Sequence, residues 1–245
     1  MIAKLPRWVW AGAAVLAFNG GMINAVAILG FVHKGITHVT GNCSLLSIAL
    51  MEGDRGGVAQ LFFIVVSFFL GSVLSGVLLG DAHLRMGRRY GLVMALESVL
   101  LVISTYGSLK GSVHGEYFVS MAAGLQNAMA STYSGAIVRT THLTGILTDL
   151  GALAGNRLRG LRVDVKRAWL LSVILGSFIA GGLFGVASYH HLGPWAMLGP
   201  AVLMALSAAG YELFRKQRTR QNIRPLQRTS HPTLVEPVVQ ASNPR

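Results

Sequence analysis

Charged side chains are scarce in this sequence. Asp, Glu, Lys and Arg together make up 12% of its 245 residues, whereas a soluble domain of this size carries about a quarter. Most of the surface must therefore face something other than water. The acidic sign is the rarer one, with 9 Asp and Glu against 21 Lys and Arg. The basic residues lie between and after the apolar stretches, as in membrane proteins, so the net charge does not indicate binding to nucleic acid.

Cysteine and catalytic motifs are also lacking. The single cysteine, Cys43, excludes an intramolecular disulfide and leaves no cysteine framework for zinc. The sequence contains no Gly-x-Ser-x-Gly, no His-Glu-x-x-His and no P-loop. We therefore expect no enzyme, no bound metal and no cofactor.

Long apolar runs are what the sequence does contain. A membrane-spanning helix needs about 20 apolar residues, and six runs meet this length: 8–31, 58–80, 90–109, 117–138, 168–190 and 195–214. Lys and Arg interrupt none of them. Ala25-Val26-Ala27 resembles a signal-peptidase site, but the first run continues to Phe31 and is longer than an ordinary signal core. These runs predict an all-α membrane protein with six spans.

Two shorter apolar segments, 37–51 and 141–155, fit a different role. Fifteen helical residues cover about 22 Å, less than the roughly 30 Å of a hydrocarbon core. Each segment opens with Thr, which can cap a helix, so we expect half-helices sheltered by the bundle. With both termini cytoplasmic, this arrangement leaves Lys34, Arg55 and Lys110 as the only basic residues outside. If both segments crossed, more basic residues would be outside, so six spans are favoured over eight.

An internal repeat relates the two halves of the chain. Thr37-His38-Val39-Thr40-Gly41 matches Thr141-His142-Leu143-Thr144-Gly145, and Gly21-Met22-Ile23-Asn24-Ala25 matches Gly124-Leu125-Gln126-Asn127-Ala128. Each half, about 8–109 and 117–214, then holds one span, one half-helix and two more spans. Three spans is an odd number, so the second half is inverted relative to the first. The sequence predicts a 3+3 inverted repeat within a membrane domain of residues 1–214.

The segment 215–245 is basic, polar and proline-bearing, which predicts a disordered cytoplasmic tail. It either attracts anionic lipid headgroups, as the basic loops do, or serves only as an orientation signal at a solvated end. A homodimer is compatible with six spans, although nothing in the sequence identifies an interface.

Three motifs carry a resemblance to a known family. They are Thr40-Gly41-Asn42, Gly124-Leu125-Gln126-Asn127-Ala128 and Thr140-Thr141-His142-Leu143-Thr144-Gly145. Together they resemble the YoaK-type family of bacterial six-span inner-membrane proteins, over about residues 8–214. The resemblance implies a bacterial inner membrane and little chemistry, because the function of that family is not established. Relatives often carry Asp where this chain has Asn24, which weakens a proton-relay role at that position.

The repeated motifs are candidates for a solute site. A half-helix that starts inside the membrane places free N–H groups and a positive dipole end there, and two such starts would suit an anion or a carbonyl-bearing solute. The alternatives are close helix packing at Thr-Gly, amides acting as structural hydrogen bonds, and His38 and His142 acting as caps. The expected site residues are Asn24, Thr37, Thr40, Gly41, Asn42, Gln126, Asn127, Thr141, Thr144 and Gly145.

Two acids complete the set of candidates. Glu97 lies within an apolar run and Asp149 within a half-helix, and an acid at membrane depth often marks a pathway or proton relay. Each is otherwise a neutral, hydrogen-bonded acid, or, for Asp149, an interfacial group beside Arg157. The leading hypothesis is a secondary transporter or channel for a small solute. The alternative is a non-transporting scaffold or accessory subunit, and an intramembrane enzyme is the weakest of the three.

Overall fold

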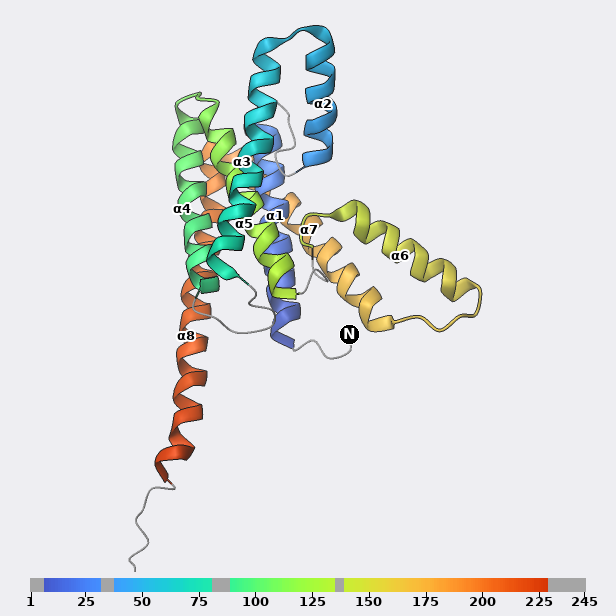
Figure 1. Ribbon diagram of the computed structural model, residues 1–245, viewed down its shortest axis with the longest axis vertical. Coiled ribbons are helices and arrows are strands. Elements are labelled where there is room, and N and C mark those ends of the chain that lie inside the picture. The colour runs from blue at the N-terminus through green and yellow to red at the C-terminus, as the bar shows by residue number, and fades with distance from the viewer. Residues whose placement is uncertain (1–6, 32–37, 81–88, 135–138, 229–245) are drawn as a thin grey trace, which may run out of the picture.

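The computed structural model describes residues 7–31, 38–80, 89–134 and 139–228, and each of its elements is a helix (Figure 1). In chain order these are α1 (Arg7–Gly30), α2 (Val39–Glu52), α3 (Arg55–Leu79), α4 (Arg89–Leu109), α5 (His114–Ser134), α6 (Leu143–Leu158), α7 (Val165–Leu192), the short 3₁₀ helix η2 (Gly193–Met197) and α8 (Leu198–Arg228). The expected all-α class is confirmed. The two short segments form α2 and α6, close to their predicted bounds.

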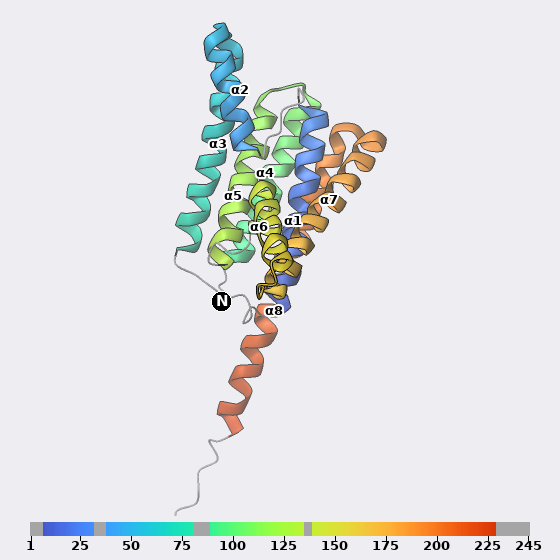
Figure 2. The ribbon, with the colours of Figure 1, turned by 90° about the vertical axis from the view of Figure 1, so that its right-hand side faces the viewer.

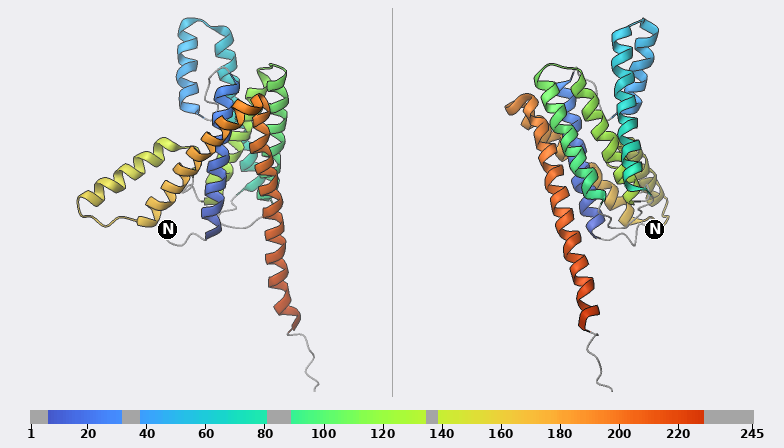
Figure 3. Two further views of the ribbon diagram at one scale, coloured as in Figure 1. Left: turned by 180° about the vertical axis from the view of Figure 1, so that it is seen from behind. Right: turned by 60° about the vertical axis from the view of Figure 1, so that its left-hand side comes forward.

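Within the described ranges, four helical stretches are long and apolar enough to cross a membrane: Trp8–Gly30, Arg55–Leu79, Arg89–Leu109 and Val165–Gln217. The last contains α7, η2 and α8, which form a hairpin because the chain reverses direction at η2 (Figure 3). Two predicted runs therefore belong to this one stretch. The predicted run 117–138 is described only as far as the end of α5. These helices are compatible with a multi-pass membrane protein.

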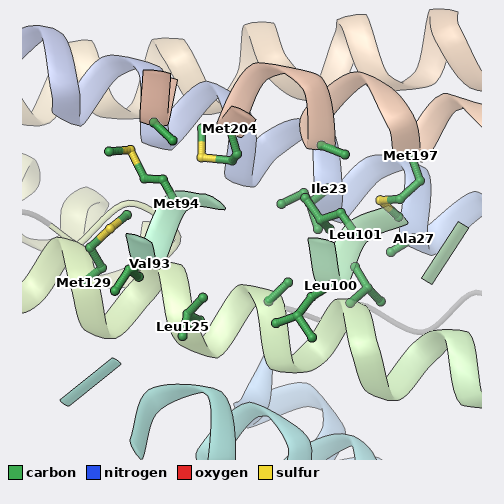
Figure 4. Packing of buried hydrophobic residues seen from close by; sticks show 14 of the residues in the cluster. Ile23, Ala27, Val93, Met94, Leu100, Leu101, Leu125, Met129, Met197 and Met204 are labelled. Carbon is green, nitrogen blue, oxygen red and sulfur yellow. The ribbon is translucent and has the colours of Figure 1, made fainter. Parts of the chain in front are cut away.

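The bundle core is built from α1, α4, α5 and α8. Figure 4 shows how their buried side chains interdigitate, with Ile23, Leu101, Leu125 and Met204 at the centre. Lipid tails are as apolar as these side chains, so a bundle in a membrane is held by close van der Waals packing more than by exclusion of water. The helices must therefore fit closely.

Glycines let two helix pairs come into backbone contact. A side chain on Gly21 of α1 would overlap the carbonyl oxygen of Phe178 in α7, and one on Gly181 of α7 would overlap that of Phe18 in α1. The α3·α5 pair repeats this arrangement. There Gly71 meets the carbonyl oxygen of Met121, and Gly124 meets that of Phe68. Each contact in one pair thus has a counterpart in the other.

The third helix of each half also starts in the same way. The Asp54 carboxylate accepts from the Gly57 N–H at 3.0 Å and caps α3. The Asp164 carboxylate accepts from the Arg167 N–H at 3.1 Å and caps α7. The number of residues from Asp54 to Gly71 equals that from Asp164 to Gly181, so cap and close contact keep the same register in both halves.

The helices α2 and α6 stand at the margin of the bundle (Figures 1 and 2). α2 folds back on α3 at Gly53, whose φ of 71° suits a residue without a side chain. It buries only Asn42 and Ala49, and α6, which packs on α7, buries only Ile146. Most of their surface is left to lipid or to another protein.

The end of the chain differs from the expectation. α8 continues to Arg228, so the first part of the segment predicted to be disordered is helical. Arg, Lys and Gln, which fill the segment after Phe214, are good helix formers, and the apolar part of α8 provides a helix that they can extend. Residues 229–245 lie outside the described residues.

The close backbone contacts predict a specific sensitivity. Gly71→Ala should lower the free energy of unfolding by roughly 1–3 kcal/mol, because the added methyl group pushes α3 away from α5. Gly76→Ala, on the same helix, places its methyl in open space and should be neutral or stabilising by up to about 1 kcal/mol. Unfolding of the purified variants in a detergent titration measures both. Equal effects would show that α3 and α5 do not pack through Gly71.

Candidate functional site

The starts of α2 and α6 lie close together, near the middle of the bundle's height, and the two helices lead away in opposite directions (Figures 1 to 3). Contacts with α1 agree with this. A Cβ on Gly20 would come within 2.9 Å of the Thr141 methyl carbon, just before α6. The Asn24 amide nitrogen is 3.5 Å from His38 Nε2, just before α2. Gly20 and Asn24 are four residues apart, so both starts lie on one face of α1, about one helical turn from each other.

At the start of α2, an amide of α1 meets the residue that precedes the helix. Asn24 is buried, whereas His38 is exposed at the N-cap position. The His38 side chain makes no capping hydrogen bond, and the first N–H donated within the helix is that of Asn42, to the His38 carbonyl oxygen. The preceding N–H groups of the first turn are therefore available to a ligand.

The start of α6 also has an amide beside it, but this amide bonds the residue before the N-cap. The Thr141 hydroxyl donates to Asn127 Oδ1 at 2.6 Å, and the Asn127 amide donates to the Ala123 carbonyl oxygen at 2.9 Å. His142 occupies the N-cap position without a side-chain cap. Its ring lies against Gly145, where a side chain would require the ring to move. Asn24 and Asn127 thus hold two equivalent helix starts through partners fourteen residues further along the chain.

A second polar cluster, the core network, lies next to the start of α6. It consists of Asn19 of α1, Glu97 of α4, Gln126 of α5 and Thr140, all essentially without solvent exposure. The Asn19 amide donates to Glu97 Oε1 and to Gln126 Oε1, both at 2.9 Å. The Gln126 amide donates to the Leu16 carbonyl oxygen at 2.9 Å and to the Thr140 hydroxyl at 3.5 Å. Because neighbouring residues of α5 hold Thr140 and Thr141, the core network and the α6 start are continuous.

Asp149 is in a different environment from Glu97. Its carboxylate pairs with the Arg167 guanidinium at 2.6 Å, and the two side chains are 45% and 42% exposed. It therefore lies at the edge of the bundle in an ion pair, and its partner is Arg167, whereas the sequence suggested Arg157. An exposed pair of this kind contributes little to stability.

The remaining expected residues lie around the two starts. Thr40 and Gly41 are exposed in the first turn of α2, and Thr144 is exposed in the first turn of α6. Asn42 faces inward and is buried. Thr37 falls outside the described residues. Among the residues that are described, no group of three His, Cys, Asp or Glu side chains could hold a metal ion.

Sequence reasoning missed Asn19 and, as a site residue, Thr140. Asn19 was visible as an amide inside an otherwise apolar run, which is the kind of residue that marks a polar contact within a bundle. Nothing in the repeat pointed to it, because Asn19 lies upstream of the matched motif. Thr140 precedes the matched motif of the second half in the same way.

A family model, described as "Protein of unknown function (DUF1275)", matches residues 12–210. The chain belongs to this family. Membership agrees with the resemblance to the YoaK-type proteins. The matched region runs from within α1 to within α8 and contains the starts of α2 and α6 and the core network. No curated protein and no solved structure matches the chain.

The hydrogen bond between Thr141 and Asn127 should fix the start of α6. Thr141→Val keeps the side-chain shape and removes the hydroxyl, so the first turn should open more readily by about 1 kcal/mol. The rate of amide hydrogen exchange of the full chain, read from a proteolytic peptide within Leu143–Leu158, should rise accordingly. Thr148→Val is the matched control, because the Thr148 hydroxyl bonds only within α6, to the Thr144 carbonyl oxygen at 2.9 Å. Faster exchange in the control alone would contradict this role for Thr141.

Proposed function

We propose that the chain is a secondary transporter or channel of a bacterial inner membrane, with a site for a small solute between the starts of α2 and α6. The observation that carries this proposal is the matched pair of helix starts on one face of α1. Each leaves first-turn N–H groups without a side-chain cap. Backbone of this kind is tolerated at membrane depth only where protein shelters it or where it lines a cavity.

A 3+3 inverted repeat supports the same proposal. The close contacts of α1 with α7 and of α3 with α5 pair the first helix of one half with the third helix of the other. This reciprocal pairing is expected when two halves are related by a two-fold axis in the membrane plane. In transporters of this type the half-helix starts of the two repeats face one solute near the midplane. Rocking of one half against the other would then expose the site alternately to each side.

Two features favour small anionic or carbonyl-bearing solutes. Helix N-termini present N–H donors and a positive dipole end, and His38 and His142 place an imidazole beside each start. Acidic side chains are absent from the described first turns of both helices. A cation would find few acceptors there.

The proposed orientation has both termini in the cytoplasm. The turns at Gly53 and Gly111 and the η2 hairpin lie at one end of the bundle, and the starts of α1 and α4 lie at the other (Figures 1 and 3). The second end carries Arg89 and the basic residues of α8, which supports a cytoplasmic placement.

Topology can be tested with single cysteines in a Cys43→Ser background, a substitution at an exposed position of α2. Ser112→Cys, in the α4–α5 turn, should react with an impermeant thiol reagent added outside intact cells. Arg215→Cys should react only after the cells are opened. Labelling of Arg215→Cys from outside would contradict the proposed orientation.

The solute site can be tested with purified protein in liposomes and a panel of phosphate, sulfate, chloride, acetate and amino acids. Thr40→Val and Thr144→Val should each weaken binding of a transported solute about five- to thirtyfold, because each removes one hydroxyl worth about 1–2 kcal/mol. If both hydroxyls contact one solute, the effects in the double variant should not add. Binding and thermal melting are measured on each variant.

The control for this test is Thr148→Val, which removes a hydroxyl from α6 one turn further from the start. It should leave binding unchanged. Additive losses of about 1 kcal/mol in stability with normal binding would indicate helix caps. In that case the chain would be better described as a scaffold or accessory subunit.

A further inference from the structure

The core network contains more hydrogen-bond acceptors than donors. Asn19 uses both amide hydrogens, on Glu97 and Gln126, and Gln126 uses both of its own, on Leu16 and Thr140. Two buried oxygens, Glu97 Oε2 and Asn19 Oδ1, then have no hydrogen-bond partner among the described residues. An unpaired acceptor away from water costs free energy, and a charged one costs most. The described part of the chain gives Glu97 no cation as a partner.

We propose that Glu97 is a proton-binding group of this protein and that its proton load is communicated to the start of α6. Binding forms an O–H bond at Glu97 Oε2, takes the proton from water and changes the charge of the network from −1 to 0. One proton removes the charge and turns an open acceptor into a donor, so it lowers the cost of burying the network. A metal cation would instead need several oxygen ligands around it.

The coupling follows from the order of the hydrogen bonds. The bond from Asn19 to Glu97 is charge-assisted while the carboxyl is ionised and weakens when it is neutral. Asn19 is then held more by Gln126, whose own amide reaches Thr140. Thr140 directly precedes Thr141, which fixes the α6 start to Asn127. This part of the inference rests on the proposed solute site, whereas proton binding by Glu97 does not.

An apolar pocket of about 260 Å³ leads toward the network from the end of the bundle that carries Trp8 and Phe214. Leu16, Met94 and Met129 line it. Each is three residues from a member of the network on the same helix, so the pocket comes within about one turn of Asn19, Glu97 and Gln126. This end is the proposed cytoplasmic one, so the proton would reach Glu97 from the cytoplasm.

Arg139 and His142 flank Thr140 and Thr141 in the chain, and Tyr133 lies seven residues after Gln126 on α5. The titratable groups described next lie further along the packed helices. α1 has none between Trp8 and Gly30, and those of α3 end with Arg55 at its start. On α5, Glu116 and its neighbours His114 and Tyr117 lie about 13–18 Å along the helix from Gln126. At the pocket end, Tyr90 packs on Tyr211 with ring centroids 6.2 Å apart, and Glu212 lies against Gly91 and pairs with Arg215 at 2.7 Å. A titration centred on Glu97 can therefore be separated from theirs by substitution.

The repeat makes the network specific to one half. Where the second half has Gln126, the matched motif of the first half has Ile23, which is buried in the apolar core. The residue that precedes Asn24 therefore cannot make the hydrogen bonds that Gln126 makes before Asn127.

Infrared spectroscopy of the full chain in lipid nanodiscs tests the proposal, because a protonated carboxylic acid has its own carbonyl band. The wild type should show a band that titrates with pH, and Glu97→Gln should remove it. Gln keeps the shape of the side chain and can still accept from Asn19, so this variant should fold. Asn19→Leu should move the midpoint of the titration by roughly 1–2 pH units and Thr140→Val by roughly 0.3.

Glu116→Gln is the matched control. Glu116 is also buried and also accepts from an amide, that of Gln60 at 2.7 Å, but lies outside the core network. It should leave the titrating band in place. A band that persists in Glu97→Gln, or a midpoint that follows the sodium concentration, would overturn proton binding by Glu97. An unchanged midpoint in Thr140→Val would overturn the coupling. None of these measurements needs a solute, so a failure to find transport would leave their result standing.

Discussion

Two pairs of helices in this bundle approach until the backbone of one touches the backbone of the other. Glycine at Gly21 and Gly181, and again at Gly71 and Gly124, removes the side chains that would keep them apart. In a lipid environment no expulsion of water draws apolar helices together, so this close fit supplies the attraction. It also fixes the depth of α1 and α5, the two helices that carry Asn24 and Asn127.

The positions of the half-helices follow from this constraint. α2 and α6 bury too little of their own surface to be placed by packing alone. They are positioned instead at their starts, by hydrogen bonds to α1 and α5, and at their ends, by the turns into α3 and α7. Because the helices at both ends of each half-helix belong to a glycine-packed pair, a shift of one pair would move a helix start. The geometry of the candidate site therefore depends on how the two pairs are packed.

Much of this arrangement could be predicted from the sequence, because apolar length and repeated motifs are local properties. The run lengths predicted α2 and α6 as half-helices, and the matched motifs predicted Asn24 and Asn127 as equivalents. The equivalence of α3 and α7, with Asp54 and Asp164 as caps, could not be recognised in this way, because the sequences of the two helices are too different to match. The partner of Asp149 depends on how α6 folds back on α7. Asn19 could be recognised only once its neighbours on α4 and α5 were known, because the sequence around a single amide does not show which distant residues it contacts.

The two halves differ in how their short helices are held at the start. An inverted repeat with two identical halves would respond equally to both sides of the membrane and would have no preferred direction. In this chain Asn24 contacts the residue before α2, whereas the α6 start is held by an amide next to a network that ends at a carboxyl group. Under the proposed proton binding, a change of charge at Glu97 would act on the α6 start through these bonds. A different response of the two halves needs only a difference in hydrogen-bond strength between the ionised and the neutral form of Glu97. A charge-assisted bond provides a difference of this size. The matched buried position, Ile23 in one half and Gln126 in the other, is the difference on which this proposed bias rests.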